Sequence, residues 1–365
     1  MKNKKIFIIL PHLGGGGAEK STLYLVNDWV KKNYVVYLIL MNKKGELLSK
    51  LDSKVKIIDL NCNRIYKTFL PCYKLIKLYK PDVILTLMWP LTSVIFFAWI
   101  FSFKRGKLFL ADHNPFINEW FQDFKINKML FILSYNLTYL FASGIICVSK
   151  NIKNEIKKIL LFKKNNIYHI YNPVKYFDKN SYDIKYFKKI LFNQSKYCFL
   201  SVGRLKKSRD VITVLEAFKN FKHLNDSRLV ILGDGPEKNN LMKYVKNNNI
   251  HNYVEFKGFV EDTYKYYCAA DLYIHSSLYD AMPLTLIEAL VCNTKILSTD
   301  CKYGPREILK KDNLGIIIKT NDTNEMLKGF DEALNTKIDT IKREQMKKEF
   351  LIENISKQYL KVFFN

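Results

Sequence analysis

The sequence predicts an α/β protein of two domains, each built on a doubly wound parallel sheet. Three observations predict this fold. A chain of 365 residues is long enough for two domains of ordinary size. Short apolar runs alternate with stretches of helical spacing through both halves of the chain, which is typical of parallel sheets covered by helices. Hydrophobic residues form 48% of the chain and charged residues 25%, so both domains can bury a core.

The first half supplies one sheet. Its strands are the buried apolar runs at residues 6–10, 35–40, 83–87, 108–111 and 145–149. Helical spacing is found between them at residues 18–32, 66–80 and 127–141. The stretch 83–103 contains no charged residue and is long enough for a membrane span. Because Pro90 interrupts it, we prefer a buried strand followed by a helix over 91–103.

The second half repeats this plan. Its strands are expected at 198–203, 229–233, 254–258, 272–277, 295–299 and 315–319, and its helices at 211–221, 236–247, 261–270, 283–292 and 324–334. We therefore place one domain at residues 1–180 and a second at 181–345. Residues 346–365 are expected to form a C-terminal helix that packs back toward the first domain. That helix belongs to one long charged helix expected over about 338–364.

Charge and cysteine usage restrict the class of protein. The seven cysteines show no C-x-x-C pair and no zinc-binding spacing, so we expect reduced thiols in a cytoplasmic protein. Residues 1–180 hold 29 Lys+Arg against 11 Asp+Glu, a net charge of +18 out of +25 for the chain. Both a polyanionic partner for this half and a lysine-rich composition without function stay open. No nucleic-acid-binding module is recognisable, so nucleic acid is not an expected partner.

A run of four glycines carries the first chemical signal. Residues 14–17 lie directly after the first strand and before a helix. Glycines let the backbone approach a ligand closely, and the helix start directs N–H groups and a positive dipole end at the loop. The spacing is neither that of a dinucleotide-binding G-x-G-x-x-G nor that of a Walker loop. We expect a phosphate or sugar site, with a flexible turn as the alternative.

Two further segments carry charged residues at strand ends. Arg204 and Arg209 follow the strand at 198–203, where guanidinium groups can clamp a diphosphate. Asp280 precedes a helix that begins near Pro283, and capping of that helix is the simpler interpretation of this acid. Glu288 lies inside the helix among apolar residues, which makes it a candidate ligand contact.

Together these segments resemble the retaining glycosyltransferases of group one, or family four. That family has the GT-B fold, in which two Rossmann-like domains with parallel sheets face an interdomain cleft. The matching segments are GGAEK (16–20), VGRL with LEAF (202–218), LGDGPEKNNL (232–241), VEFKGFV (254–260), AADLYIHSS (269–277), PLTLIEAL (283–290), STDCKYGPREIL (298–309) and GIII (315–318). The first half matches mainly at the glycine loop and at LADHN (110–114).

The resemblance implies a role for each matching residue on the phosphate side of the donor. Gly16 and Gly17 approach the donor phosphates and the transferred sugar. Arg204 and Arg209 neutralise the diphosphate, with Arg209 standing where the family usually has lysine. Asp210 stands where the family usually has glycine or asparagine, which puts an acid beside the clamp.

Further roles follow from the same resemblance. Gly258 and Phe259 lie where the backbone reads the nucleotide base, and Glu288 lies where a glutamate binds the ribose hydroxyls. Asp280 replaces the glutamate that contacts the transferred hexose and is shorter by one methylene. The backbone amides of Met282 and Leu284 contact sugar and phosphate. His113 lies near the reacting sugar, with a strand-end histidine bonded to backbone as the alternative.

The activity implied is transfer of a hexose or N-acetylhexosamine from a nucleotide sugar, UDP-linked in related surface-glycan enzymes. The acceptor implied is a glycan or a polyprenyl-diphosphate-linked glycan. No cofactor or metal is expected, because the sequence has no D-x-D motif. We expect a cytoplasmic enzyme, with the basic first half offering a surface for the inner membrane through lysines such as Lys74, Lys77 and Lys80.

Other classes of enzyme fit part of the pattern. A sugar-nucleotide epimerase can share the two-domain fold, but the segment that pairs Asp280 with Glu288 argues against it. A nicotinamide-dependent oxidoreductase fits the first strand, glycine loop and helix, but its glycine spacing differs.

Overall fold

The computed structural model describes residues 3–113, 121, 127–177, 182–309 and 314–365. Contacts within the described chain divide it into two compact units. Unit 1 comprises Met1–Lys175 and Phe350–Asn365, and unit 2 comprises Tyr176–Glu349. The boundaries expected from the sequence fall at residues 180 and 345.

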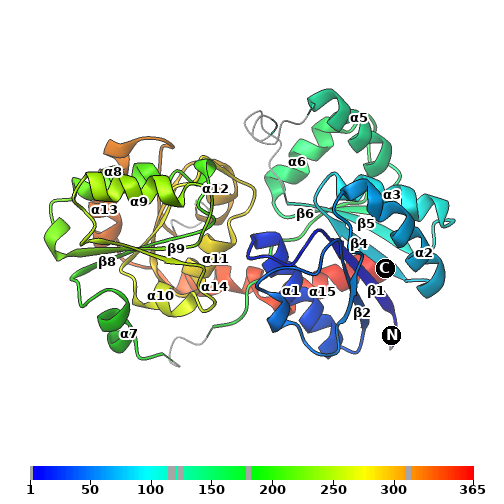
Figure 1. The fold of residues 1–365 in the computed structure, drawn as a ribbon, viewed down its shortest axis with the longest axis horizontal. Helices are drawn as coiled ribbons and strands as arrows, with labels where there is room; N and C mark the ends of the chain where they lie inside the picture. Colours follow the sequence, from blue (N-terminus) through cyan, green and yellow to red (C-terminus); the bar gives the residue numbers. More distant parts are fainter. Residues whose placement is uncertain (1–2, 114–120, 122–126, 178–181, 310–313) are drawn as a thin grey trace. The chain divides into compact units, whose positions relative to one another are not determined.

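Unit 1 is built on a parallel sheet whose described strands run in the order β3-β2-β1-β4-β5-β6-β7 (Figure 1). The strands are β1 (Lys5–Leu10), β2 (Val35–Leu40), β3 (Lys56–Asp59), β4 (Val83–Leu87), β5 (Lys107–Asp112), β6 (Gly144–Cys147) and β7 (Ile167–His169). The described helices are α1 (Gly17–Lys31), α2 (Phe69–Tyr79), α3 (Leu91–Phe101), α5 (Lys128–Tyr139), α6 (Lys150–Ile159) and α15 (Ile352–Phe364). The central strands are mostly apolar and buried because helices cover both of their faces.

The long uncharged stretch of the first half folds as the sequence predicts, into β4 followed by α3. Every residue of β4 is buried in the sheet. Most of α3 is buried as well, against α2 and α5. Among the described residues, no helix combines the length and the apolar character needed to cross a membrane.

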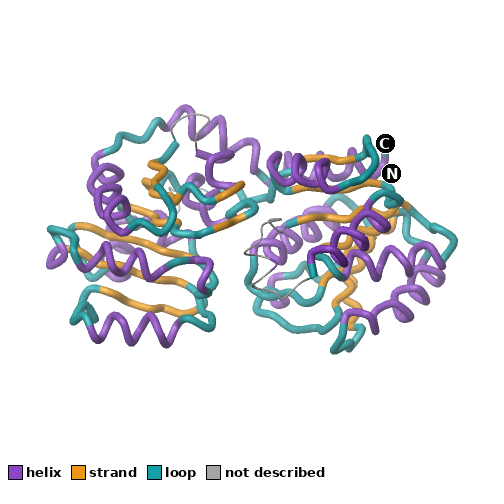
Figure 2. Tube along the Cα trace, turned by 90° about the horizontal axis from the view of Figure 1, so that it is seen from above, coloured by secondary structure: helices purple, strands orange, loops and turns teal. Residues whose placement is uncertain are grey.

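Unit 2 repeats the architecture with the order β10-β9-β8-β11-β13-β15. Its strands are β8 (Tyr197–Val202), β9 (Ser227–Leu232), β10 (Val254–Gly258), β11 (Leu272–His275), β13 (Lys295–Thr299) and β15 (Ile316–Ile318), with β12 (Tyr279–Asp280) and β14 (Lys302–Tyr303) in a separate small parallel pair. Its described helices are α7 (Ile184–Leu191), α8 (Val211–Lys219), α9 (Lys238–Asn247), α10 (Tyr264–Ala269), α11 (Leu284–Val291), α12 (Gly304–Leu309), α13 (Thr323–Asn335) and α14 (Thr340–Phe350). Within each unit, helices enclose the strands (Figure 2).

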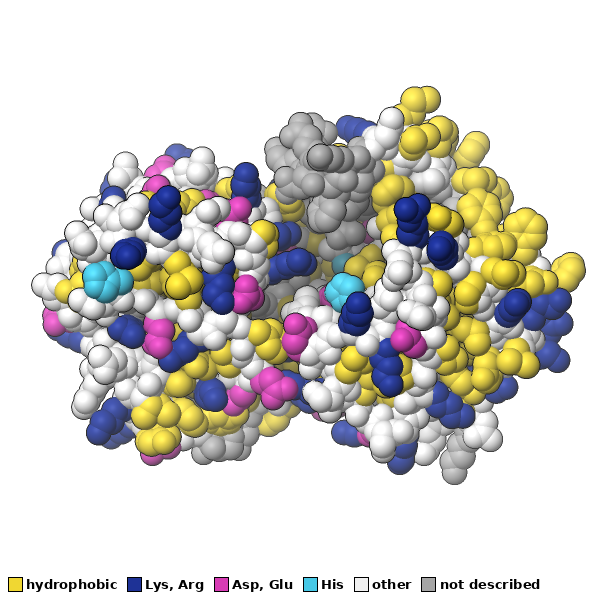
Figure 3. Space-filling view, in the orientation of Figure 1, with side chains coloured by type: hydrophobic (Ala, Val, Ile, Leu, Met, Phe, Trp, Pro, Cys, Tyr) yellow, Lys and Arg dark blue, Asp and Glu magenta, His cyan; other side chains and the backbone are white. Residues whose placement is uncertain are grey.

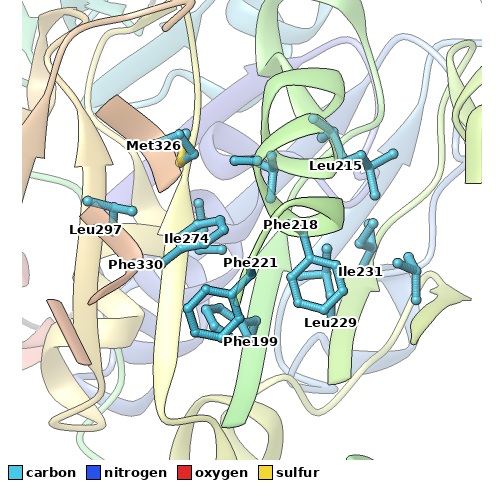
Figure 4. Close-up of a cluster of buried hydrophobic side chains, with 14 of the residues drawn as sticks. Phe199, Leu215, Phe218, Phe221, Leu229, Ile231, Ile274, Leu297, Met326 and Phe330 are labelled. Atoms are coloured by element: carbon cyan, nitrogen blue, oxygen red, sulfur yellow. The ribbon is translucent and has the colours of Figure 1, made fainter. Parts of the chain in front are cut away.

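Aromatic side chains form the centre of the unit 2 core (Figure 4). The ring of Phe199 on β8 lies 5.4 Å from that of Phe218 on α8 and 5.1 Å from that of Phe330 on α13. All three side chains are fully buried. These contacts fix α8 and α13 on one face of the sheet, so the loop that joins β8 to α8 starts and ends on rigid elements.

The C-terminal segment corrects one expectation. The predicted single helix over about 338–364 is two helices, α14 and α15, separated at Leu351. Leu351 is extended, with φ −62° and ψ 140°, and pairs with Val174. The Val174 N–H donates to the Phe350 carbonyl at 2.8 Å, and the Ile352 N–H donates to the Val174 carbonyl at 3.0 Å. A backbone pairing with a distant segment therefore interrupts the helix.

Candidate functional site

Both sheets share a strand order that creates a binding crevice. In unit 2 the chain moves from β8 outward to β9 and β10, and then returns to the other side of β8 to form β11. Loops that leave neighbouring strands in opposite directions open a crevice at the carboxyl edge of an α/β sheet, and ligands bind there. In unit 2, Arg204 and Arg209 follow β8, and the segment 276–280 follows β11. The sequence-predicted residues of this unit thus flank its crevice.

Arg209 is the centre of a polar cluster at this point. Its Nη1 donates to Asp280 Oδ2 at 2.5 Å and to Ser277 Oγ at 2.7 Å. His275 Nε2 lies 3.5 Å from the same nitrogen. Gly203 lies directly beside the arginine, because even a Cβ at this position would be in van der Waals contact with Arg209 Nε, at 3.4 Å. Residues about 70 positions apart in the chain therefore meet through one guanidinium group.

The electrostatics of the cluster keep Asp280 ionised. Burial alone would raise the pKa of Asp280, but the Arg209 guanidinium and His275 beside it bring that pKa well below its usual range. Burial would lower the pKa of Arg209, and the Asp280 carboxylate raises it instead. Burial lowers the pKa of His275, which is therefore neutral at pH 7 and adds no repulsion to Arg209.

Capping does not explain Asp280. No side chain caps the start of α11, and the Asp280 carboxylate is engaged with Arg209. The helix-cap interpretation of this acid is therefore wrong. The ion pair also joins Arg209, which is expected at the diphosphate, to Asp280, which is expected at the hexose.

The backbone conformation explains why an aspartate follows Arg209 at position 210. Asp210 adopts a left-handed conformation, with φ 47° and ψ 43°, where the chain enters α8. Glycine, asparagine and aspartate tolerate this conformation best. Asp210 is buried, and burial raises its pKa. The departure from the family's glycine or asparagine thus satisfies the same backbone requirement.

The other arginine of the loop is unlike Arg209. The Arg204 side chain is exposed directly after β8. No ion pair to it occurs among the residues that the structure describes. It is therefore available to an anionic ligand at the edge of the crevice.

The segment expected at the base lies on the far strand of the same sheet. Gly258 ends β10 with φ +68°, and its carbonyl accepts from the Gly233 N–H at 2.6 Å. A left-handed conformation of this kind favours glycine. Phe259, which follows, exposes much of its side chain.

Backbone amides lie at the start of α11, where contacts to sugar and phosphate are expected. Helix N-termini leave the first N–H groups without intrahelical partners, and such groups bind anions. Leu284 is the first residue of α11, and Met282 lies just before it. Glu288 lies one turn further along and is buried. Burial raises the pKa of Tyr267, and the negative charge of Glu288 raises it further, so the two side chains are neighbours.

The crevice of unit 1 holds the glycine loop, between β1 and β4 in the sheet. Gly16 precedes α1 and Gly17 is its first residue. A Cβ at Gly16 would lie only 2.3 Å from Glu19 Oε2, so glycine is needed to admit this carboxylate to the first turn. An acid at a helix N-terminus is favourable. The negative charge of Glu19 also makes the loop better suited to binding sugar hydroxyls than to binding a phosphate.

His113 follows β5 in the same unit. Burial lowers its pKa to about 4, so the imidazole is neutral at pH 7. Its Nε2 is enclosed and has no hydrogen-bond partner within the described part of the chain. A buried nitrogen without a partner is unfavourable unless a ligand supplies one. Asn114 of the same motif lies outside the described residues.

The cluster includes two residues that the sequence analysis did not single out, His275 and Ser277. Their signal was present, because HSS follows the apolar run LYI at the carboxyl end of a strand. His275 Nδ1 lies 3.1 Å from Ser298 Oγ on β13, which fixes the ring. Among the described residues no group of three or more His, Cys, Asp or Glu side chains could hold a metal ion.

Comparison with known proteins places both units in one enzyme class. Residues 183–350 match the family model described as glycosyl transferases group 1, and residues 15–176 match that of glycosyltransferase family 4. An uncharacterized glycosyltransferase of Methanocaldococcus jannaschii is 29% identical over 67% of the chain, which spans 62% of that protein.

Two further similarities extend over nearly the whole chain. The N-acetylgalactosamine-N,N'-diacetylbacillosaminyl-diphospho-undecaprenol 4-alpha-N-acetylgalactosaminyltransferase of Campylobacter jejuni is 26% identical over 91% of the chain and 90% of that protein. The crystal structure of Anabaena HepE in complex with UDP has a TM-score of 0.77 at 17% identity, and the match covers 98% of both chains. That structure has the GT-B fold, like the two parallel-sheet units described above. The chain therefore belongs to the group 1 and family 4 glycosyltransferases.

Proposed function

We propose that this glycosyltransferase moves a hexose or N-acetylhexosamine from a UDP-sugar to a lipid-linked glycan, in the assembly of a surface polysaccharide. The observation that carries the proposal is the Arg209 cluster at the crevice of unit 2, a fixed cation where a donor diphosphate would bind. The name of the Campylobacter relative supports an undecaprenol-linked acceptor. The UDP bound to HepE supports the choice of nucleotide.

The proposed reaction retains the configuration of the sugar. An acceptor hydroxyl forms a bond to the anomeric carbon on the face from which the diphosphate departs. The bond from that carbon to the phosphate oxygen breaks, and the hydroxyl proton passes to the leaving diphosphate. A retaining route through a covalent intermediate needs two carboxylates about 5 Å apart. Asp280 is a poor nucleophile for that route, because it is engaged with Arg209.

Charge stabilisation supplies most of the proposed rate enhancement. Arg204 and Arg209 neutralise the diphosphate as it leaves, and the amides at the start of α11 donate hydrogen bonds to it. Neutral His113 accepts a hydrogen bond from a hydroxyl group of the sugar or donates one to a sugar oxygen, without adding charge. Metal independence and work at the cytoplasmic membrane face belong to the same proposal.

Release of UDP tests the proposal. The purified chain is incubated with UDP-linked glucose, galactose and their N-acetyl derivatives, with and without a polyprenyl-diphosphate-linked glycan. We expect one donor to release UDP faster in the presence of acceptor, and a product that keeps the donor's anomeric configuration by NMR. Arg204→Ala should lower turnover by about 100-fold, a transition-state effect of about 3 kcal/mol. Inversion at the anomeric carbon, or conversion of the donor without acceptor, would contradict it.

A further inference from the structure

Helix α5 of unit 1 carries apolar side chains on the side that faces solvent. Its inner face packs into the unit through Phe131, Tyr135 and Tyr139, all fully buried. Its outer face repeats every three or four residues, and the exposed fractions are 64% for Leu130, 54% for Leu133, 51% for Leu137 and 62% for Phe141 just beyond the helix. A helix that is apolar on both sides is unusual at a surface in contact only with water.

A second exposed apolar pair adjoins this face. Leu161 and Phe162 follow α6 and are 72% and 71% exposed. Asn136 of α5 fixes their position, because its Oδ1 accepts from the Leu161 N–H at 2.7 Å and its Nδ2 donates to the Ile159 carbonyl at 3.0 Å. Figure 1 shows α5 and α6 side by side, and Figure 3 shows hydrophobic side chains gathered at that edge of unit 1. The six residues Leu130, Leu133, Leu137, Phe141, Leu161 and Phe162 are called the α5 face below.

A basic pocket opens beside the α5 face. It has a volume of about 400 Å³ and is lined by Leu161 and Phe162 together with Lys153, Lys157, Lys163 and Lys164. Lys164 is engaged in the structure, because its Nζ donates to the Leu140 and Ala142 carbonyls. α5 contains no acid, and Glu155, the acid of α6, pairs with Lys158. Exposed apolar side chains thus border a cavity lined by cations.

We propose that the α5 face docks on the surface of a bilayer that contains anionic lipids. The apolar side chains enter the boundary between head groups and acyl chains, and the lysines that line the pocket bind lipid phosphates. Charge favours this occupant over a second copy of the chain, because a copy with the same net charge of +25 would bring like charges together. The proposal deepens the proposed function, since a lipid-linked acceptor is presented at such a surface.

The α5 face is distinct from the lysine-rich face of α2 expected from the sequence. Lys74, Lys77 and Lys80 attract an anionic surface through charge, which salt screens within about 8 Å at physiological ionic strength. Insertion of leucine and phenylalanine side chains is not screened. Docking through the α5 face should therefore keep part of its strength at high salt.

Vesicle flotation of the full chain tests the proposal. Vesicles of phosphatidylcholine, with and without phosphatidylglycerol, are used at low and high sodium chloride. We expect binding that needs phosphatidylglycerol and falls only partly with salt. The double variant Leu133→Ser/Leu137→Ser should weaken binding by about tenfold or more, because two exposed leucines no longer leave water. Lys153→Glu/Lys157→Glu should weaken binding to the vesicles that contain phosphatidylglycerol, because two cations of the pocket become anions.

Matched variants make the test decisive. Ile190→Ser/Ile341→Ser removes two exposed isoleucines of unit 2, 50% and 72% exposed, and should leave binding unchanged. UDP affinity measured by calorimetry on the same samples separates this proposal from the proposed function, because the α5 variants should bind UDP normally. Loss of vesicle binding in Lys74→Glu/Lys77→Glu/Lys80→Glu but not in the α5 variants would overturn the proposal. So would a dimer in solution that Leu133→Ser/Leu137→Ser dissociates, with no vesicle binding by the unaltered chain.

Discussion

Arg209 is held by side chains from a different part of unit 2. Asp280 and Ser277 both accept from its Nη1, and Asp280 is itself almost fully charged at any pH above the acid range. A guanidinium group held in this way loses little freedom when a diphosphate binds. Asp280 acts in this account as a positioning residue for Arg209.

A double-mutant cycle on UDP affinity tests this coupling. Arg209→Ala and Asp280→Asn are measured alone and together by calorimetry. We expect each single variant to weaken UDP, and the pair to weaken it by less than the sum, with an interaction energy of about 1 kcal/mol or more. Glu288→Ala, expected at the ribose, should be additive with Arg209→Ala. Additive losses for Arg209 and Asp280 would show that the two side chains act separately.

His113 should make unit 1 sensitive to mild acid. Its folded-state pKa of about 4 lies below the ordinary histidine value, so the unfolded chain binds a proton first as the pH falls. Its contribution to stability is therefore complete above pH ~6.5 and is lost between pH ~6.5 and ~4. Thermal midpoints of His113→Gln should fall less steeply than those of the unaltered chain over this range. Parallel curves would contradict the buried neutral imidazole.

The sequence could predict which residues lie at strand ends, but not which of them touch. Arg209 and Asp280 each follow a buried apolar run, so their placement at a crevice followed from pattern alone. Their contact depends on the order of β8 and β11 in the sheet, which a local pattern does not contain. The role of His275 could not be predicted, because a single histidine at the end of an apolar run is most often a core residue.

At the scale of elements, strands were easier to predict than the helix end near Leu351. Runs such as residues 83–87 are apolar except for Thr86, and such a run is typical of a strand covered on both faces. The break between α14 and α15 has no proline or glycine, and it arises from pairing with Val174, far away in sequence. The helices expected to start at residues 236 and 261 also begin later in the structure, at Lys238 and Tyr264.

Helix α15 should contribute strongly to the stability of unit 1. Phe363 is fully buried, with its ring 5.5 Å from that of Trp29 on α1 and 5.0 Å from that of Phe109 on β5. Phe363→Ala should cost about 3–5 kcal/mol and lower the thermal midpoint of unit 1 by about 10 °C. Lys361→Ala, exposed on the same helix, is the control and should change it little. Equal midpoints for the two variants would mean that α15 does not hold unit 1 together.

At the scale of the whole molecule, the two units divide charge unevenly. The excess of lysine in residues 1–180 left open both a polyanionic partner and a lysine-rich composition without function. The exposed α5 face adds apolar side chains to that charge, which composition alone does not locate. The interdomain cleft stays a prediction, because each unit is described by itself.

Metal independence is expected for the complete enzyme. The proposed leaving-group stabilisation comes from Arg204, Arg209 and the start of α11, so turnover should survive excess chelator. The measurement is UDP release with and without EDTA, followed by added magnesium or manganese. Complete loss of activity, restored by either ion, would mean that the cation at the diphosphate is a metal rather than arginine.

The most direct test of the account is titration of UDP into the unaltered chain and into Arg209→Ala, with Arg228→Ala as the control. Arg228 is a matched arginine of the same unit that pairs with Glu255, away from the β8–β11 crevice. We expect UDP to bind the unaltered chain and the control alike, and Arg209→Ala about 10- to 100-fold more weakly, because a charged hydrogen bond to the diphosphate is lost. Unchanged UDP affinity in a folded Arg209→Ala variant, or no UDP binding by the unaltered chain, would contradict the central claim.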